Sequence, residues 1–417
     1  MRMRISRRLL ALSVAAVATV AACSSDDGAA RSTDLSTAPA TDSPTAGAPE
    51  PSSEASTSSV AAETSTTETS NTGAPTTEPA TTEAAPAAIV PDQWTAVDPG
   101  PGCMCMDGSP FQLWDRPSDP TKVVLYFEGG GACFSAETCA FENSTATVNL
   151  DLGSPPSGRG GLFDQTNPEN PLADYSMVYV PYCSGDVHIG NKTTQYSPDL
   201  TVHHNGYVNA TAGLDYLVAT YPDVEELVVT GVSAGAVPTP LFGALAADEL
   251  PNAEVTTFGD SAGAYPDVPA VNASIGAGLW GTDTIDPGWP EYAALTPEQR
   301  SIPGLYVVAG QHNPDITFSR FDFAFDETQA FFGSIAGIGA DQLVTLIDQT
   351  AAQIEASGVP LATYVAPGTT HTILLGDEFY DMEVEGVRLV DWFRAVLNGH
   401  SDGGPPPDVH CVECNAP

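Results

Sequence analysis

The sequence contains few basic residues. Only 13 of its 417 residues are lysine or arginine, against 53 aspartates and glutamates, and the formal net charge is −40. Proteins that bind nucleic acid neutralise phosphates with lysine and arginine, so this composition excludes a nucleic-acid partner. Five of the basic and ten of the acidic residues precede residue 89, which leaves eight against 43 in the remainder. Because no EF-hand loop is present, we interpret this acidity as a hydrated surface suited to salty surroundings rather than a calcium-binding one.

The start of the chain also lacks an apolar run long enough to cross a bilayer. Residues 9–22 are predominantly apolar and follow four arginines. Because this apolar stretch is too short to span the membrane as a mature helix, residues 1–22 are predicted to be a signal peptide. The small residues before Cys23 resemble a bacterial lipobox. They predict cleavage before Cys23, a lipid on its sulfur, and anchoring to the outer face of the bacterial cell membrane. An ordinary secretory signal with an incidental cysteine is the alternative.

Aliphatic side chains are scarce in residues 23–88, which consist mainly of serine, threonine, alanine, proline and acidic residues. Such a segment cannot bury enough apolar surface to offset the entropy of ordering it, so it is predicted to be a disordered tether. Residues 89–417 then form the folded part. Its length is ordinary for a single hydrolase domain with loop insertions, and we expect a monomer.

Cysteine is comparatively plentiful, which indicates an oxidising compartment. Of the eight cysteines, seven remain if Cys23 carries a lipid: Cys103, Cys105, Cys133, Cys139, Cys183, Cys411 and Cys414. Zinc binding is the alternative to disulfides, but an exported, tethered chain favours disulfides and no metal. The odd count leaves at least one thiol unpaired.

Within residues 89–417, apolar strand patterns alternate with helix patterns. Strands are predicted over residues 123–128, 175–182, 227–230, 254–260, 316–322 and 362–365, and helices over residues 209–221, 240–250, 305–311, 340–357 and 384–397. This alternation predicts an α/β fold, a doubly wound and mostly parallel sheet of the α/β-hydrolase type with helices on both faces. In such sheets functional groups lie beyond the carboxyl ends of the strands.

One strand-to-helix junction carries the motif Gly231-x-Ser233-x-Gly235. A strand, this motif and then a helix form the arrangement of a nucleophile elbow, in which a serine hydroxyl stands exposed above the sheet. A turn of small residues, as found in many α/β proteins, is the alternative. The strand before the motif and the helix after it favour the nucleophile.

A nucleophilic serine needs a base and a carboxylate that orients the base. His371 follows the last predicted strand and precedes the terminal helix, where the hydrolase order Ser…Asp…His places the base; a structural histidine is the alternative. Asp260 and Asp326 both lie beyond strands between Ser233 and His371, and position alone does not separate them.

The glycine-rich segment 129–131 follows the first predicted strand. It resembles the loop that donates an oxyanion-hole N–H in esterases, and the N–H of Ala234 would be the second donor. A phosphate-binding loop is the alternative, but no Gly-Lys-Ser/Thr follows.

Together these segments resemble the pectin acetylesterase family, which includes the animal carboxylesterase Notum. The matching motifs are Cys105-Met-Asp-Gly-Ser-Pro, Phe127-Glu-Gly-Gly-Gly-Ala-Cys133, Pro181-Tyr-Cys-Ser-Gly-Asp186, the serine motif, Gly259-Asp-Ser-Ala-Gly263 and Ala324-Phe-Asp-Glu-Thr-Gln329. The resemblance implies that Asp326 completes the triad and that Gly130 and Gly131, with Ala234, form the oxyanion hole. It also implies two disulfides, Cys105–Cys183 and Cys133–Cys139. Many relatives carry tryptophan where this chain has Gly131, so we expect a more open pocket wall.

The resemblance implies a serine carboxylesterase without metal or cofactor that hydrolyses O-acetyl esters on an extracellular polysaccharide. Ser233 would attack the carbonyl carbon, His371 would transfer the proton, and Asp326 would hold the imidazole. Two other functions stay open. One is removal of acyl chains from a lipid or a protein, and the other is non-catalytic glycan binding on a hydrolase scaffold.

Overall fold

The computed structural model describes residues 93–156, 160–335 and 337–414. The predicted signal peptide, the tether and Cys23 lie outside the described residues, so these domain boundaries stay predictions. Within the described ranges, no helix combines the length and the apolar composition needed to cross a membrane.

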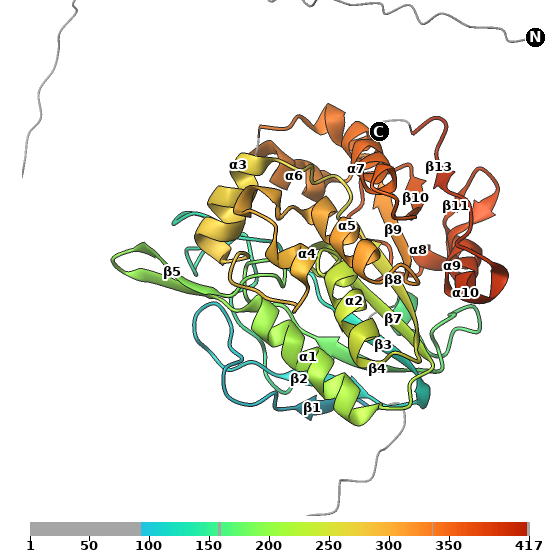
Figure 1. Ribbon diagram of the computed structural model, residues 1–417, viewed down its shortest axis with the longest axis horizontal. Coiled ribbons are helices and arrows are strands. Elements are labelled where there is room, and N and C mark those ends of the chain that lie inside the picture. The colour runs from blue at the N-terminus through green and yellow to red at the C-terminus, as the bar shows by residue number, and fades with distance from the viewer. Residues whose placement is uncertain (1–92, 157–159, 336, 415–417) are drawn as a thin grey trace, which may run out of the picture. The chain divides into compact units, whose positions relative to one another are not determined.

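A nine-stranded sheet forms the centre of the fold, in the order β1-β2-β4-β3-β7-β8-β9-β10-β13 (Figure 1). Its strands are β1 Thr95–Val97, β2 Leu113–Arg116, β3 Asp119–Phe127, β4 Tyr175–Val180, β7 Glu226–Val232, β8 Glu254–Asp260, β9 Thr317–Phe323, β10 Ala362–Ala366 and β13 Val409–His410. The β1–β2 and β2–β4 pairs are antiparallel, and every pair from β4 to β13 is parallel. The predicted mostly parallel sheet is confirmed.

The order of the strands reverses at β3, which has β4 on one side and β7 on the other. Crevices in open α/β sheets form at such a switch point, outside the carboxyl ends of the strands. The glycine-rich segment follows β3, and Ser233 follows β7. The topology therefore brings these two motifs together.

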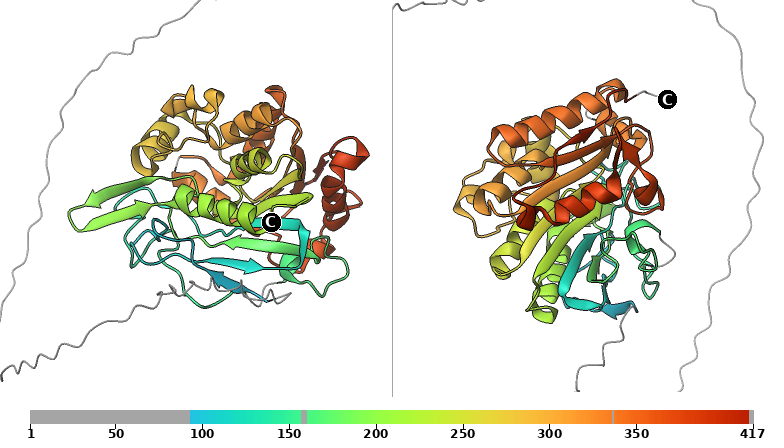
Figure 2. Two further views of the ribbon diagram at one scale, coloured as in Figure 1. Left: turned by 60° about the horizontal axis from the view of Figure 1, so that its bottom comes forward. Right: turned by 90° about the vertical axis from the view of Figure 1, so that its right-hand side faces the viewer.

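Helices cover both faces of the sheet (Figure 2). Along β3, Val123, Leu125 and Phe127 belong to one apolar cluster, whereas Val124 and Tyr126 belong to another. The first cluster also takes side chains from α1 Gly206–Thr220, α2 Thr239–Glu249 and α5 Ile302–His312. The second takes them from α8 Glu378–Asp381, α9 Leu389–Leu397 and the start of α7 Leu343–Ala356. Burial on both faces explains why the central strands have no alternation of apolar and charged residues, as in β3, where residues 123–127 are all apolar or aromatic.

Some predicted boundaries were wrong. The last long helix begins at Leu389 and not at residue 384, because β11 Glu383–Val384 and β12 Val387–Arg388 form a hairpin there. Its two turn residues, Glu385 at φ +49° and Gly386 at φ +81°, have the left-handed backbone that a tight hairpin requires. The sequence reading also missed the hairpin of β5 Lys192–Ser197 and β6 Leu200–His204, which extends from the body in Figure 1.

The remaining short helices are α3 Pro269–Val271, α4 Pro290–Ala293, α6 Glu327–Ile335 and α10 Gly399–Asp402. Directly after α3 the chain continues as a π-helical segment, Asn272–Trp280. π-Helical segments are rare in proteins, and those that occur often lie at functional sites. This one forms part of the wall of the cavity described below.

Candidate active site

The serine of the Gly-x-Ser-x-Gly motif lies on a sharp turn at the carboxyl end of β7. Ser233 has φ +56°, a backbone conformation uncommon outside glycine, and it begins the 3-10 turn Ser233–Gly235 that leads toward α2. A Cβ on Gly231 would collide with the carbonyl oxygen of Gly235, and a Cβ on Gly235 would collide with that of Phe127. Both glycines are therefore needed for this turn to pack against the end of β3.

His371 and Asp326 meet beyond the carboxyl ends of β10 and β9. Nδ1 of His371 lies 2.7 Å from Oδ2 of Asp326. Asp326 is fully buried, and its Oδ1 accepts the backbone N–H groups of Thr328 and Gln329, both at 2.9 Å, at the start of α6. This capping fixes the orientation of the carboxylate. Nε2 of His371 is buried and has no hydrogen-bond partner, so it is not bonded to Oγ of Ser233 in this structure. Hydrogen bonds of this kind often tighten only when a substrate binds.

Asp260, the other candidate carboxylate, has a different set of partners. Its Oδ2 accepts the backbone N–H groups of Ile373 at 2.9 Å and Leu374 at 3.0 Å, and its Oδ1 accepts the hydroxyl of Ser261. Burial raises the pKa of Asp260 to about 7, although these donors and the nearby His371 act in the opposite direction. Asp326 thus contacts the imidazole of His371, whereas Asp260 accepts hydrogen bonds from the backbone that follows His371.

The same contacts tie the histidine loop to the nucleophile strand. Asp260 pairs with Val232, the residue before Ser233, in the β7–β8 ladder. Ser261 Oγ accepts the N–H of Thr372 at 3.2 Å, and both of these residues have positive φ. The side chains of Asp260 and Ser261 therefore connect the loop of His371 to β8, and β8 pairs with the end of β7, next to Ser233.

Ser261 belongs to a second Gly-x-Ser-x-Gly sequence, residues 259–263. It too follows a strand and has a left-handed backbone, with φ +66°. Its side chain is fully buried, however, and its hydroxyl is held between Asp260 and Thr372. Ser233 lines the cavity described below, and Ser261 does not.

The glycine loop lies beside the serine. Gly131 and Ala234 line the same cavity as Ser233, whereas Gly130 does not. Ala234 lies in the first turn of a 3-10 helix, where backbone N–H groups have no partner within the helix. Gly131 has φ +79°, and a Cβ there would collide with the carbonyl oxygen of Thr145. Gly131 and Ala234 thus lie beside the serine, and Gly130, which precedes Gly131 in the same loop, stays a predicted oxyanion donor.

The cavity has a volume of about 230 Å³ and a mainly apolar lining. Its aliphatic and aromatic side chains include Val237, Val268, Val271, Ile275, Ile302 and Phe332. Six of its lining residues carry a polar side-chain group: Ser233, Tyr265, Asn272, Trp280, Thr282 and Arg300. The indole N–H of Trp280 already donates to the carbonyl oxygen of Cys133. An apolar cavity that opens beside a serine can hold the acyl part of an ester.

Comparison with known proteins identifies the family. The pectinacetylesterase family model matches residues 89–277. The inactive palmitoleoyl-protein carboxylesterase notum1b of Danio rerio is 34% identical over 97 residues, which are 22% of this chain and 70% of that protein. The chain belongs to the pectin acetylesterase family.

Other relatives match shorter shares of their own length. The palmitoleoyl-protein carboxylesterase NOTUM of Schmidtea mediterranea is 30% identical over 141 residues, 32% of this chain and 26% of that protein. Pectin acetylesterase 4 of Arabidopsis thaliana is 25% identical over 155 residues, 36% of this chain and 38% of that protein. The structure of the Wnt deacylase Notum from Drosophila has a TM-score of 0.58 and 19% identity, and the match covers 76% of this chain and 96% of that one. The α/β-hydrolase fold of Notum is therefore shared.

In this member of the pectin acetylesterase family, the structure contains both disulfides that the resemblance implied, Cys105–Cys183 and Cys133–Cys139. A third joins Cys411 to Cys414, which the sequence had left unsettled. Among the described cysteines Cys103 is free. Burial, followed by nearby carboxylates, raises the pKa of its thiol to about 11, so Cys103 is protonated at neutral pH and a poor nucleophile.

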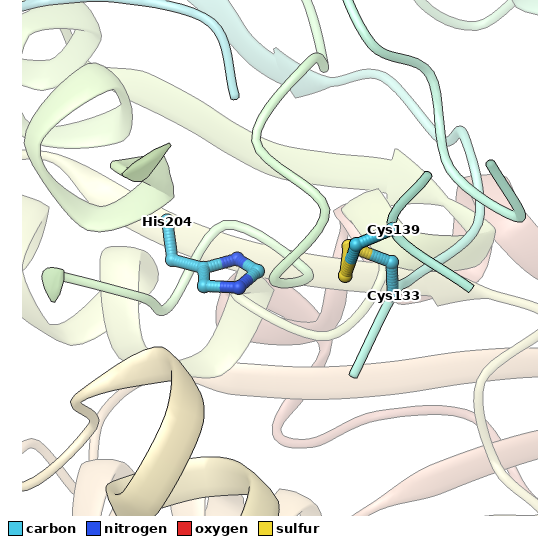
Figure 3. A group of neighbouring side chains, drawn as sticks. All are labelled: Cys133, Cys139 and His204. Carbon is cyan, nitrogen blue, oxygen red and sulfur yellow. A yellow bond between two sulfur atoms is a disulfide. The ribbon is translucent and has the colours of Figure 1, made fainter. Parts of the chain in front are cut away.

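Figure 3 shows the imidazole of His204 beside the Cys133–Cys139 disulfide. The sulfur atoms of the two cysteines and one ring nitrogen of His204 could each bind a metal ion, and they lie within 4.8 Å of one another. The sulfurs are bonded to each other, however, and the ring nitrogens of His204 lie 2.8 Å from the hydroxyl of Tyr196 and 3.0 Å from the carbonyl oxygen of Ser184. The group therefore offers no free ligand atom to a metal ion in this state.

Each of the other histidines has partners away from Ser233. His188 lies 2.8 Å from the carbonyl oxygen of Glu128, and burial lowers its pKa to about 4. The remaining contacts are His203 with Thr193, His312 with Glu291 and Asp248, His400 with Val255, and His410 with Asp348. None of these residues lines the cavity, and His371 does not line it either, so the contact of its Nδ1 with the buried carboxylate of Asp326 is what distinguishes His371.

Sequence reasoning missed the far wall of the cavity. Residues 265–282, which contain the π-helical segment, and Arg300 had no assigned role. Residues 265–282 are mainly apolar but have neither a helical nor a strand period, and such a composition does not predict where a segment packs. Arg300 is an isolated basic residue in the sequence.

Proposed function

We propose that this protein is a serine carboxylesterase that uses Ser233, His371 and Asp326. One observation carries this proposal: a histidine with Nδ1 bonded to a buried carboxylate and Nε2 unpartnered, on a loop tied to the strand of a serine in the elbow conformation. Nucleophilic catalysis by serine requires a base of this kind, held by a carboxylate and with its second nitrogen available for the serine hydroxyl.

In the proposed reaction Oγ of Ser233 attacks the ester carbonyl carbon while His371 Nε2 takes its proton. Asp326 holds the Nδ1–H tautomer and stabilises the imidazolium that forms. The N–H groups of Ala234 and Gly131 stabilise the oxyanion. The alcohol leaves with the proton from His371, and a water molecule then hydrolyses the acyl-enzyme by the same sequence.

The cavity supports an acyl group longer than acetyl. An apolar cavity of about 150 Å³ already holds a benzene molecule, and the cavity beside Ser233 has a volume of about 230 Å³. Burial of each further methylene group there would stabilise binding by about 0.8 kcal/mol. Similarity to relatives that are named palmitoleoyl-protein carboxylesterases also supports a longer acyl group. We therefore favour deacylation of a lipid- or protein-linked acyl chain.

Hydrolysis of O-acetyl esters on an extracellular polysaccharide is the second candidate, supported by the pectinacetylesterase match over residues 89–277. A series of 4-nitrophenyl esters from acetate to decanoate separates the two. The favoured function predicts that kcat/KM rises with chain length before it falls. A maximum at acetate, together with acetate release from acetylated pectin or xylan, would select the second.

The Ser233→Ala variant tests the nucleophile itself. Turnover of the best ester should fall by several orders of magnitude. Ser261→Ala is the comparison variant, because Ser261 occupies the same motif, follows a strand and has a similar φ but is fully buried. It removes only the contacts with Asp260 and Thr372, so its loss of turnover should be much smaller than that of Ser233→Ala. Undiminished turnover in folded Ser233→Ala would contradict the proposal, whereas absence of turnover with every ester in the folded wild-type protein would support a non-catalytic glycan-binding protein.

We also propose that the chain is exported, monomeric and lipid-anchored at Cys23 to the outer face of the cell membrane. The lipobox-like residues before Cys23 and the tether composition support this. Replacement of Cys23 by serine should move the protein from the membrane fraction to the soluble fraction, and no redistribution would contradict the anchor.

A further inference from the structure

The wall of the apolar cavity contains two buried polar atoms that have no partner in the protein. They are Nε of Arg300 and Oγ1 of Thr282, and both residues line the cavity. Thr282 is only 3% exposed. A buried donor without an acceptor costs free energy and is uncommon in native structures, so this pair requires an explanation.

The two residues are held side by side. Nη1 of Arg300 donates to the carbonyl oxygen of Thr282 at 2.7 Å, and its guanidinium carbon lies 4.6 Å from the ring centroid of Tyr292. These contacts fix the guanidinium but leave its Nε–H without an acceptor. A planar donor group fixed in this way is preorganised for an anion.

The charge of Arg300 is also unpaired. No ion pair joins Arg300 to a carboxylate among the described residues, although the chain is strongly acidic. Four other basic residues do form such pairs: Lys122 with Glu226, Arg320 with Asp322, Arg388 with Glu169, and Arg394 with Asp391. An unpaired cation in an otherwise apolar cavity favours a negatively charged group on the molecule that enters it.

We propose that the acyl group cleaved by this enzyme carries a second carboxylate, which Arg300 and Thr282 bind within the cavity. This inference rests on the proposed esterase function and names its substrate class, the half-esters of dicarboxylic acids. Methylene groups would pack on the aliphatic wall, and the carboxylate would accept Nε–H of Arg300 and the hydroxyl of Thr282. Hydrolysis consumes one water molecule and releases the alcohol and the dicarboxylic acid, with Ser233 regenerated.

A carboxylate on the alcohol part of the ester, such as that of a uronic acid, could also accept hydrogen bonds from Arg300 and Thr282. The apolar lining favours the acyl part, because a sugar hydroxyl group would find few acceptors or donors among these side chains. The two sources are separated by the experiment below.

The test compares two 4-nitrophenyl esters with six-carbon acyl chains, the hexanoate and the hydrogen adipate, at one salt concentration. Adipate is preferred to succinate because a succinate half-ester cyclises to its anhydride without the enzyme. The measured quantity is the ratio of kcat/KM for adipate to that for hexanoate. This ratio does not depend on the fraction of enzyme that is folded.

Arg300→Met should lower the adipate-to-hexanoate ratio by about 10- to 100-fold, the loss expected for a buried hydrogen bond to a charged group. Thr282→Val, which keeps the side-chain shape, should lower it by a smaller factor. Lys192→Met is the matched control, since it also removes one positive charge. Lys192 bonds the carbonyl oxygen of Gly278 but does not line the cavity, so the ratio should not change.

An equal ratio in wild type and Arg300→Met would overturn the inference. So would a fall in the ratio of the same size in Lys192→Met, because the effect would then come from long-range charge. If Arg300→Met instead loses turnover of acetylated oligogalacturonides while the ratio stays constant, the carboxylate belongs to the alcohol part and the inference is wrong. Failure of every ester with the wild-type enzyme would contradict the esterase function itself, which distinguishes the two failures.

Discussion

Asp260 accepts the backbone N–H of Ile373 at 2.9 Å, two residues beyond His371. The carboxylate of Asp260 thus supports the loop that carries His371 without a hydrogen bond to the imidazole. Asp326 contacts the imidazole, and Asp260 contacts the turn that carries it. The two roles lead to different expectations for the same substitution.

Asp326→Asn should lower kcat by about 10⁴-fold, because the amide stabilises the wrong tautomer of His371. Asp260→Asn removes one acceptor from the turn and keeps the Asp326–His371 bond, so its effect on kcat should be smaller by at least about tenfold. Steady-state kinetics on the best ester measure both variants. If Asp260→Asn loses more kcat than Asp326→Asn, then Asp260 and not Asp326 orients the imidazole.

Asp260 should also make stability depend on pH. Burial raises its pKa to about 7 in the folded state, above the value of an exposed aspartate, so the folded state binds more protons between about pH 4 and pH 7. The stability contributed by Asp260 is therefore complete below about pH 4 and is lost as the pH rises through 7. The free energy of unfolding of wild type minus that of Asp260→Asn should fall across this window. A difference that is constant with pH, or that grows, would show that Asp260 is ionised in the folded protein.

Gly131→Ala should reduce both stability and turnover. The new Cβ would collide with the carbonyl oxygen of Thr145, and the positive φ adds backbone strain. Gly153→Ala is the matched control, since Gly153 has φ +89° and open space around the position of a Cβ. It should cost only about 1 kcal/mol in urea unfolding and leave kcat unchanged. Equal effects of the two variants would mean that the glycine loop has no special constraint.

Added salt should raise the thermal stability. The formal net charge of −40 causes self-repulsion, and counter-ions screen it more strongly as ionic strength rises. Melting temperatures in sodium chloride should therefore increase steadily at low to moderate concentration. Calcium chloride at matched ionic strength is the control. A flat response to sodium combined with a rise at low calcium concentration would favour a calcium-binding surface.

Most of the sheet could be predicted from the sequence because its central strands are buried on both faces and are rich in apolar, β-branched and aromatic residues. The elbow could be predicted because Gly231 and Gly235 are needed for close packing and leave a signature. The choice between Asp260 and Asp326 could not be made from strand position, since both follow parallel strands at the same edge. The resemblance favoured Asp326, and the contact with His371 agrees with it.

The cavity could not be predicted, because its wall comes from segments without a regular period. The π-helical segment Asn272–Trp280 and the isolated Arg300 are brought together only by tertiary packing. The hairpin at residues 383–388 was missed for a related reason. Its apolar residues fit a helical period, and the Glu385–Gly386 turn overrides that period locally.

The most direct test of the central claim is to find the residue that a fluorophosphonate probe labels. Such a probe reacts only with a serine activated by a neighbouring base. Peptide mass spectrometry of the wild-type protein should place the label on Ser233 alone, and His371→Ala should abolish labelling. A label on Ser261, or no label on a folded protein that cleaves esters, would contradict the account.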